Sequence, residues 1–142
     1  SWSDTAISCY VPAGIAGQVQ ATVVNAAGTS NALPFEVTSP APASTWYLAE
    51  GSTAGDMETF ILVQNPGDSA AEVSLTFVTE SGPQEGPTAT LPPHTRRTWK
   101  ANDYVTSYDV STTVTSNQPV VAERAMYGAN RTWAHDSIGH AP

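Results

Sequence analysis

The sequence predicts an all-β fold of two antiparallel β-sandwich modules, the first incomplete, joined by a linker rich in Pro, Ser and Thr. Short stretches alternate apolar and polar residues with the two-residue period of a strand that buries one face. The 10 Gly and 11 Pro residues separate these stretches, as turns require. The 142 residues exceed the roughly 100 of one sandwich and fall short of two.

Residues 1–38 are the predicted first module. Ile7, Cys9 and Val11 alternate with more polar neighbours, which predicts a strand that ends at Pro12. A second strand is predicted over 18–24 and a third over 33–37, with a loop at 25–28 between them. Three strands cannot bury both faces of a sheet, so we expect another chain, a preceding segment or the next module to complete this one.

Residues 39–44 form the predicted linker, because alternating Pro keeps a chain extended. Residues 45–142 then read as a fuller sandwich of seven short strands without a helical stretch. Turns are expected around 51–52, 65–68, 81–83, 92–93 and 117–119. The expected strands cover 46–50, 59–65, 72–79, 88–91, 96–101, 110–116 and 120–127.

The first module resembles the second half of an IPT/TIG domain. The matching segments are 2–5, 7–12, 17–23, 28–31 and 35–37. IPT/TIG domains have an immunoglobulin-like fold and occur in cell-surface receptors, transcription factors and bacterial surface proteins. The opening strands of that family, with their glycine-rich turns, are not in this sequence. The resemblance therefore implies an immunoglobulin-like but partial module.

The second module resembles a unit that occurs in tandem in large secreted and surface-anchored bacterial proteins. The matching segments are WYLAEGST at 46–53, ETFILVQNP at 58–66, 97–98, 102–103, 109–111, VVAERAMY at 120–127 and 138–140. The resemblance implies a surface or secreted repeat of immunoglobulin-like fold and no catalytic activity.

The charge balance restricts the partners. The chain has 5 Lys and Arg against 13 Asp and Glu, a formal charge of −8. Its average field repels nucleic acid and anionic membranes, and no apolar run reaches the roughly 20 residues of a membrane span. We therefore expect no nucleic-acid partner and no membrane insertion. With one cysteine, Cys9, no disulfide can form within the chain. The first four residues do not resemble a signal peptide, so we expect an export signal to lie upstream.

Glu123 and Arg124 are candidate interface residues. They are neighbours in a strand that otherwise reads as core, so their side chains face opposite sides. A charge that faces inward must be paired. The sequence leaves two interpretations open: a structural ion pair with a carboxylate such as Glu50 or Glu58, or a recognition site.

Trp46 and Trp99 are candidate ligand-binding residues. Tryptophan stacks on sugar rings when it is exposed, and otherwise it packs in a core or an interface. Trp99, between Arg97 and Lys100, is expected to be the more exposed of the two. Asn130 begins a glycosylation sequon, Asn-Arg-Thr.

The histidines and acidic residues do not predict an active site. A zinc site needs three or four ligands, and we interpret His94, His135 and His140 as surface loop residues. A serine-hydrolase arrangement of Ser137 with its neighbours His135 and Asp136 is rejected, because neighbours on an extended chain point in opposite directions. We expect no cofactor, although calcium stays open because five acidic residues lie in or beside turns: Asp56, Glu58, Asp68, Asp103 and Asp109.

Taken together, these patterns favour a non-enzymatic structural or adhesive protein, secreted or at the cell surface. We expect it to be a subunit or repeat of a filament or array that assembles through β-strand contacts, with copies of itself, neighbouring modules or surface glycans as partners. The alternative is a carbohydrate-binding accessory module of a secreted hydrolase.

Overall fold

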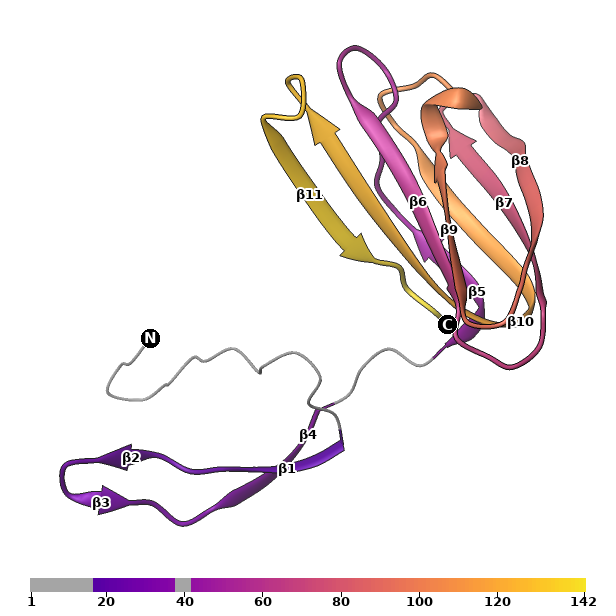
Figure 1. The fold of residues 1–142 in the computed structure, drawn as a ribbon. Coiled ribbons are helices and arrows are strands. Elements are labelled where there is room, and N and C mark those ends of the chain that lie inside the picture. The colour runs from indigo at the N-terminus through magenta and orange to yellow at the C-terminus, as the bar shows by residue number, and fades with distance from the viewer. Residues whose placement is uncertain (1–16, 38–41) are drawn as a thin grey trace. The chain divides into compact units, whose positions relative to one another are not determined.

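The computed structural model describes residues 17–37 and 42–142, and within them the protein is all-β (Figure 1). The chain forms two compact units, with the boundary between Ser39 and Pro40. The first strand of the second unit begins at Ala43, so two residues of the expected linker belong to a strand. The predicted strand at 7–11, with Cys9, lies outside the described residues.

The first unit contains a long hairpin. Strand β1 (Gly17–Ala21) pairs antiparallel with β4 (Leu33–Val37), and β2 (Val24–Asn25) with β3 (Gly28–Thr29). At the tip, the N–H of Ala27 donates to Asn25 Oδ1 at 2.8 Å, and φ of Gly28 is +137°, a value that glycine adopts readily. Leu33 and Phe35 are 66% and 41% exposed, so this hairpin presents apolar surface.

The second unit contains seven strands within residues 42–142. A short 3-10 helix, η1 (Ala101–Asp103), follows β9. The strands are β5 (Ala43–Leu48), β6 (Glu58–Asn65), β7 (Ala71–Thr79), β8 (Gly82–Leu91), β9 (Thr95–Lys100), β10 (Ser111–Gly128) and β11 (Trp133–Ile138).

Strand β10 belongs to two sheets. Its first arm, 111–116, lies between β5 and β7, and its second arm, 121–127, lies between β6 and β11. The pairing register shifts between Thr115 and Val120, where the chain reverses direction (Figure 1). The first sheet is therefore β5-β10-β7-β8 and the second is β11-β10-β6-β9. The two arms match the strands expected at 110–116 and 120–127. At 117–119, where a turn was expected, the chain stays within β10 while it changes direction.

The core lies between the two sheets. Alternate residues of β5, β6, β7 and both arms of β10 face it, as the two-residue period requires. Its largest members include Trp46 of β5, Ile61 and Val63 of β6, Val73, Leu75 and Phe77 of β7, Trp99 of β9, Val114 and Val120 of β10. No helix among the described residues has the length and apolar character needed to cross a membrane.

The sandwich has two distinct ends. Turns 66–70, 92–94 and 117–119 lie at one end, with Pro42 and residues 139–142 beside them; we call it the terminus end. Residue 140 also bridges to β5: the N–H groups of Tyr47 and His140 each donate to the other's carbonyl at 2.8 Å. The opposite end, formed by segments 49–57, 80–81, 101–110 and 129–132, is the loop end.

The segment 133–138 is a strand, where the sequence predicted surface loop. It pairs with β10 from Gly128↔Trp133 to Glu123↔Ile138, and all six of its residues are exposed. The ring of Trp133 packs on Gly128, where an added Cβ would lie 2.2 Å from Trp133 Cζ2. The expectation of a loop was wrong because a strand exposed on both faces shows no apolar alternation.

Candidate functional site

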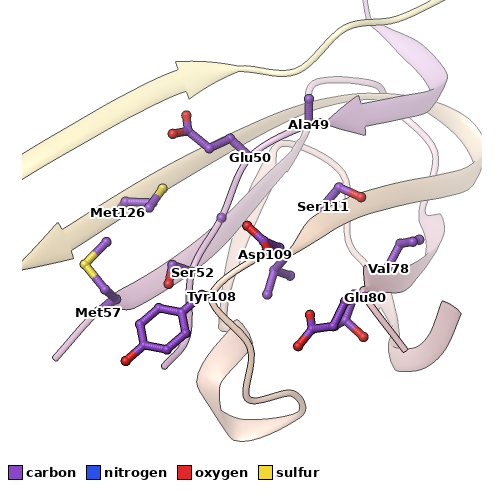
Figure 2. A pocket seen from close by; sticks show the side chains of 13 residues that line it. Ala49, Glu50, Ser52, Met57, Val78, Glu80, Tyr108, Asp109, Ser111 and Met126 are labelled. Carbon is purple, nitrogen blue, oxygen red and sulfur yellow. The ribbon is translucent and has the colours of Figure 1, made fainter. Parts of the chain in front are cut away.

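A cleft of about 500 Å³ opens between the two sheets at the loop end. The β5–β6 segment 49–52, the end of β7 and the start of β10 line it, as Figure 2 shows. Met57 and Met126 supply apolar side chains, and Tyr108, which is 69% exposed, supplies a ring. The cleft therefore combines a polar wall with a small apolar surface.

Three carboxylates, those of Glu50, Glu80 and Asp109, belong to the cleft lining (Figure 2). The hydroxyl of Ser107 donates to Glu80 and holds the pKa of that carboxyl below its usual range. The same hydroxyl accepts the N–H of Asp109 at 2.9 Å. Ionised carboxylates only accept hydrogen bonds, so the cleft suits a ligand that offers hydroxyl, amine or guanidinium donors.

The guanidinium of Arg124 lies next to this cleft, in the gap between β5 and β11. Its Nη1 donates to Glu50 Oε2 at 2.8 Å and to the Glu50 carbonyl at 3.0 Å, and its Nη2 lies 2.7 Å from His135 Nδ1. Because an arginine can only donate, Nδ1 of His135 is the acceptor of this hydrogen bond. The hydrogen bond and the charge of Arg124 lower the pKa of Glu50.

This cluster matches the ion pair expected for Arg124, with Glu50 as the partner. The side chain of Arg124 is 2% exposed and that of Glu50 is 69% exposed. Glu123, its neighbour, is exposed and faces the other side of the sheet, as expected. Nε of Arg124 is buried without a partner in the described part of the chain. The role of either residue in recognition stays a prediction.

Trp46 and Trp99 are both core residues. Trp46 is 0% exposed, and its Nε1 donates to the Val120 carbonyl at 2.8 Å. Trp99 is 4% exposed, so the expectation that it is the exposed tryptophan was wrong. Trp99 lies opposite Ile61 in the β6–β9 pairing, and this register turns its ring inward while the guanidinium of Arg97 covers it at 5.2 Å from the ring centroid.

The remaining candidates are dispersed. His94 Nε2 lies 2.9 Å from Asp68 Oδ1, His135 faces Arg124, and His140 pairs with Tyr47. Within residues 17–37 and 42–142, no three His, Cys, Asp or Glu side chains gather in a way that could hold a metal ion. Asn130 is exposed in the β10–β11 turn; its glycosylation stays a prediction.

Sequence reasoning missed the cleft itself. Its lining comes from four separate segments, and only the strand register brings them together. Tyr108 and Met57 lie in loops without a recognisable motif. The one available signal was the polar segment at 107–109, which lies directly before the strand predicted at 110–116.

The comparisons with known proteins concern the fold. Family models and curated sequences gave no match. The crystal structure of Thermotoga maritima 1070 is 20% identical with a TM-score of 0.63, covering 71% of this chain and 96% of that one. The Anabaena sensory rhodopsin transducer is 22% identical with a TM-score of 0.51, covering 58% and 87%. This chain is therefore similar to both in fold.

Proposed function

We propose that this chain is a non-enzymatic structural or adhesive part of an exported protein, secreted or held at the cell surface, and that its copies associate through β-strand contacts. The observation that carries the proposal is the outer edge of β11, along which no other strand pairs within residues 17–37 and 42–142. An exposed sheet edge is a template for another strand, and proteins usually protect such edges with proline, charge or a covering segment.

Three of the four sheet edges in the second unit carry such protection. Strand β8 contains Pro83 and Pro87, and its pairing with β7 is irregular between Ser74 and Thr76. Strand β9 carries Arg96, Arg97 and Lys100. Strand β5 is bridged to the C-terminal segment through the Tyr47–His140 pair.

Strand β11, the fourth edge, offers a row of backbone N–H and C=O groups to another strand. The N–H of Gly139 donates to the Ala122 carbonyl at 3.0 Å and the N–H of His140 donates to Tyr47. Because backbone groups alternate in direction along a strand, those of Ala134, Asp136 and Ile138 point away from β10. A second β11 can pair with this row antiparallel about a two-fold axis.

A filament needs a second contact besides the β11 edge. The hairpin of the first unit, with the exposed Leu33 and Phe35, is the proposed second surface. In the second unit, Pro42 lies beside residues 139–142 at the terminus end, so the loop end, on the opposite side, is a further surface for contacts.

The test is the mass of the full chain by light scattering, with electron microscopy, over a range of concentrations. Asp136→Pro removes an N–H that points away from β10, so it should reduce association without breaking the β10–β11 bonds. Asp136→Ala is the matched control because it keeps that N–H. Strand pairing at β11 is contradicted if the chain stays monomeric at every concentration. It is also contradicted if Asp136→Ala reduces association as much as Asp136→Pro does. A chain that begins at residue 40, the start of the second unit, tests the hairpin. If this shorter chain assembles to the same extent as the full chain, the hairpin has no role in assembly.

The alternative predicted from the sequence, a carbohydrate-binding accessory module, rested on an exposed Trp99. That residue is in the core, so this alternative needs a different surface.

A further inference from the structure

A shallow groove of about 320 Å³ lies on the outer face of the second sheet. Phe60 and Leu62 of β6, Arg96 of β9 and Tyr127 of β10 line it, together with Arg131 from the β10–β11 turn. The rings of Phe60 and Tyr127 meet edge to face with centroids 5.7 Å apart. The groove is separate from the loop-end cleft, because these residues alternate with those that face the core.

The charged side chains that line this groove, those of Arg96 and Arg131, are cations, and the carboxylates of Glu58, Glu123 and Asp136 lie on the same face of the sheet outside the lining. The whole chain has only 5 Lys and Arg residues, and three of them, Arg96, Lys100 and Arg131, lie on this face. Glu58 pairs with two of them: its oxygens accept from Lys100 Nζ at 2.5 Å and from Arg131 Nε at 2.6 Å. One carboxylate thus faces two cations. Arg96 enters none of the ion pairs found in the described part of the chain.

The turn that carries Arg131 has an unusual backbone. Ala129, Asn130 and Arg131 have φ values of +48°, +53° and +63°, which residues other than glycine rarely adopt. Asp56 Oδ2 accepts the N–H of Ala129 at 2.9 Å and so holds the turn. The guanidinium of Arg131 then lies 5.9 Å from the Phe60 centroid and 5.6 Å from that of Tyr127. Backbone strain of this kind is concentrated at ligand sites.

We propose that this groove binds a saccharide that carries carboxylate groups, such as a uronic acid polymer. The rings of Phe60 and Tyr127 offer apolar surface to a sugar ring. Arg96, and the Nη1 of Arg131 that takes no part in the Glu58 pair, offer charge-assisted hydrogen bonds to a carboxylate. The hydroxyl of Thr98 lines the same groove and can bond a sugar hydroxyl.

A saccharide fits this surface better than an acidic peptide does. Extended peptides bind sheets at an edge, where free backbone groups pair with theirs. Strand β6 lies between β9 and β10, and the second arm of β10 lies between β6 and β11. The backbone groups under the groove are therefore used within the sheet, and only side chains remain for a ligand. This inference does not depend on the proposed structural role.

The test is a titration of the full chain with oligogalacturonate, followed by calorimetry and by NMR of the Phe60 and Tyr127 ring signals. We expect binding that weakens as salt is added. Arg96→Gln should weaken it by about tenfold to a hundredfold, the loss of one or two charge-assisted hydrogen bonds. The matched control is Arg97→Gln, the next residue, whose guanidinium lies over Trp99 on the opposite face and should leave affinity unchanged.

Tyr127→Leu gives a second variant that keeps the charges and removes a ring; it should weaken binding while leaving the salt dependence intact. A neutral galactose oligomer of equal length should not bind measurably. Equal binding of that oligomer, equal binding of poly-L-glutamate, an equal loss in Arg97→Gln, or no binding of oligogalacturonate would each overturn the proposal.

Discussion

Arg124, 2% exposed in its side chain, donates to a carboxylate oxygen of Glu50, 69% exposed, at 2.8 Å. The pair thus joins a buried cation to a carboxylate at the surface. It also connects the second arm of β10 to the segment after β5, which belong to different sheets. The inter-sheet gap between β5 and β11 is filled by this contact and by His135.

The two members of this pair should differ in their effect on stability. Glu50→Ala leaves a buried guanidinium without its carboxylate and should lower the free energy of unfolding by about 1–3 kcal/mol, less than for a fully buried pair because water reaches Glu50. Arg124→Met removes the buried charge and keeps most of the volume, so it should cost under about 1 kcal/mol. Urea unfolding measures both, with Glu85→Ala on β8 as the exposed control. A larger loss in Arg124→Met than in Glu50→Ala contradicts this account.

Acid should destabilise the protein through Glu58. Its hydrogen bonds with Arg131 and Lys100 lower its pKa from 4.5 to about 2. A depressed carboxyl pKa contributes stability that is complete above 4.5 and is lost as the pH falls towards 2. The pKa values of Glu50 and Glu80 are lowered as well, so they add to the same slope. Glu58→Gln should flatten the fall in thermal midpoint across that range; an unchanged slope would show that the ion pairs do not persist in solution.

Gly128 is required by the position of the Trp133 ring. An added Cβ would lie 2.2 Å from Cζ2, so Gly128→Ala must displace the ring and should cost about 1–3 kcal/mol. Near-ultraviolet circular dichroism should report the displaced tryptophan. In the control, Gly67→Ala, the new Cβ meets Asn65 Oδ1 at 3.4 Å, an ordinary contact. Equal stability of the two variants would contradict the packing described for β11.

Asn65 connects two turns at the terminus end. It is 0% exposed, and its Nδ2 donates to the carbonyls of Ser69 at 2.8 Å and of Leu91 at 3.1 Å. Asn65→Ala leaves the buried carbonyl of Leu91 without this donor and should cost about 1–3 kcal/mol. The control is Asn117→Ala, whose side chain bonds Glu72 at an exposed site. Calorimetric melting compares the two, and a larger effect at Asn117 would be contrary to expectation.

Apolar alternation was sufficient for the strands that bury one face. Val73, Leu75 and Phe77 predict β7, and Val110 to Val114 predict the first arm of β10. Alternation failed for β11, since a strand that is exposed to solvent on both faces shows no alternation of apolar and polar residues. For Trp99, the charged neighbours Arg97 and Lys100 suggested exposure, yet the register opposite Ile61 turns the ring inward.

The candidate sites were predictable only in part. A charge in an apolar strand predicts a partner, so the Arg124 ion pair was foreseeable, while the contribution of His135 depends on a strand that the pattern does not reveal. The loop-end cleft and the outer groove each combine residues from several strands. Their existence follows from strand order and register, which side-chain periodicity does not specify.

The neighbouring entry and exit of the second unit determine how it would respond to mechanical load. Tension between residues 42 and 142 would pull β5 and the C-terminal segment apart, and the two bonds of the Tyr47–His140 pair would be the first to bear it. Bonds loaded in this way rupture in succession, as in peeling, rather than all at once, as in shear. Such a unit would begin to unfold at low force and would extend in steps. Strand β10, which both sheets share, would be among the last strands to detach.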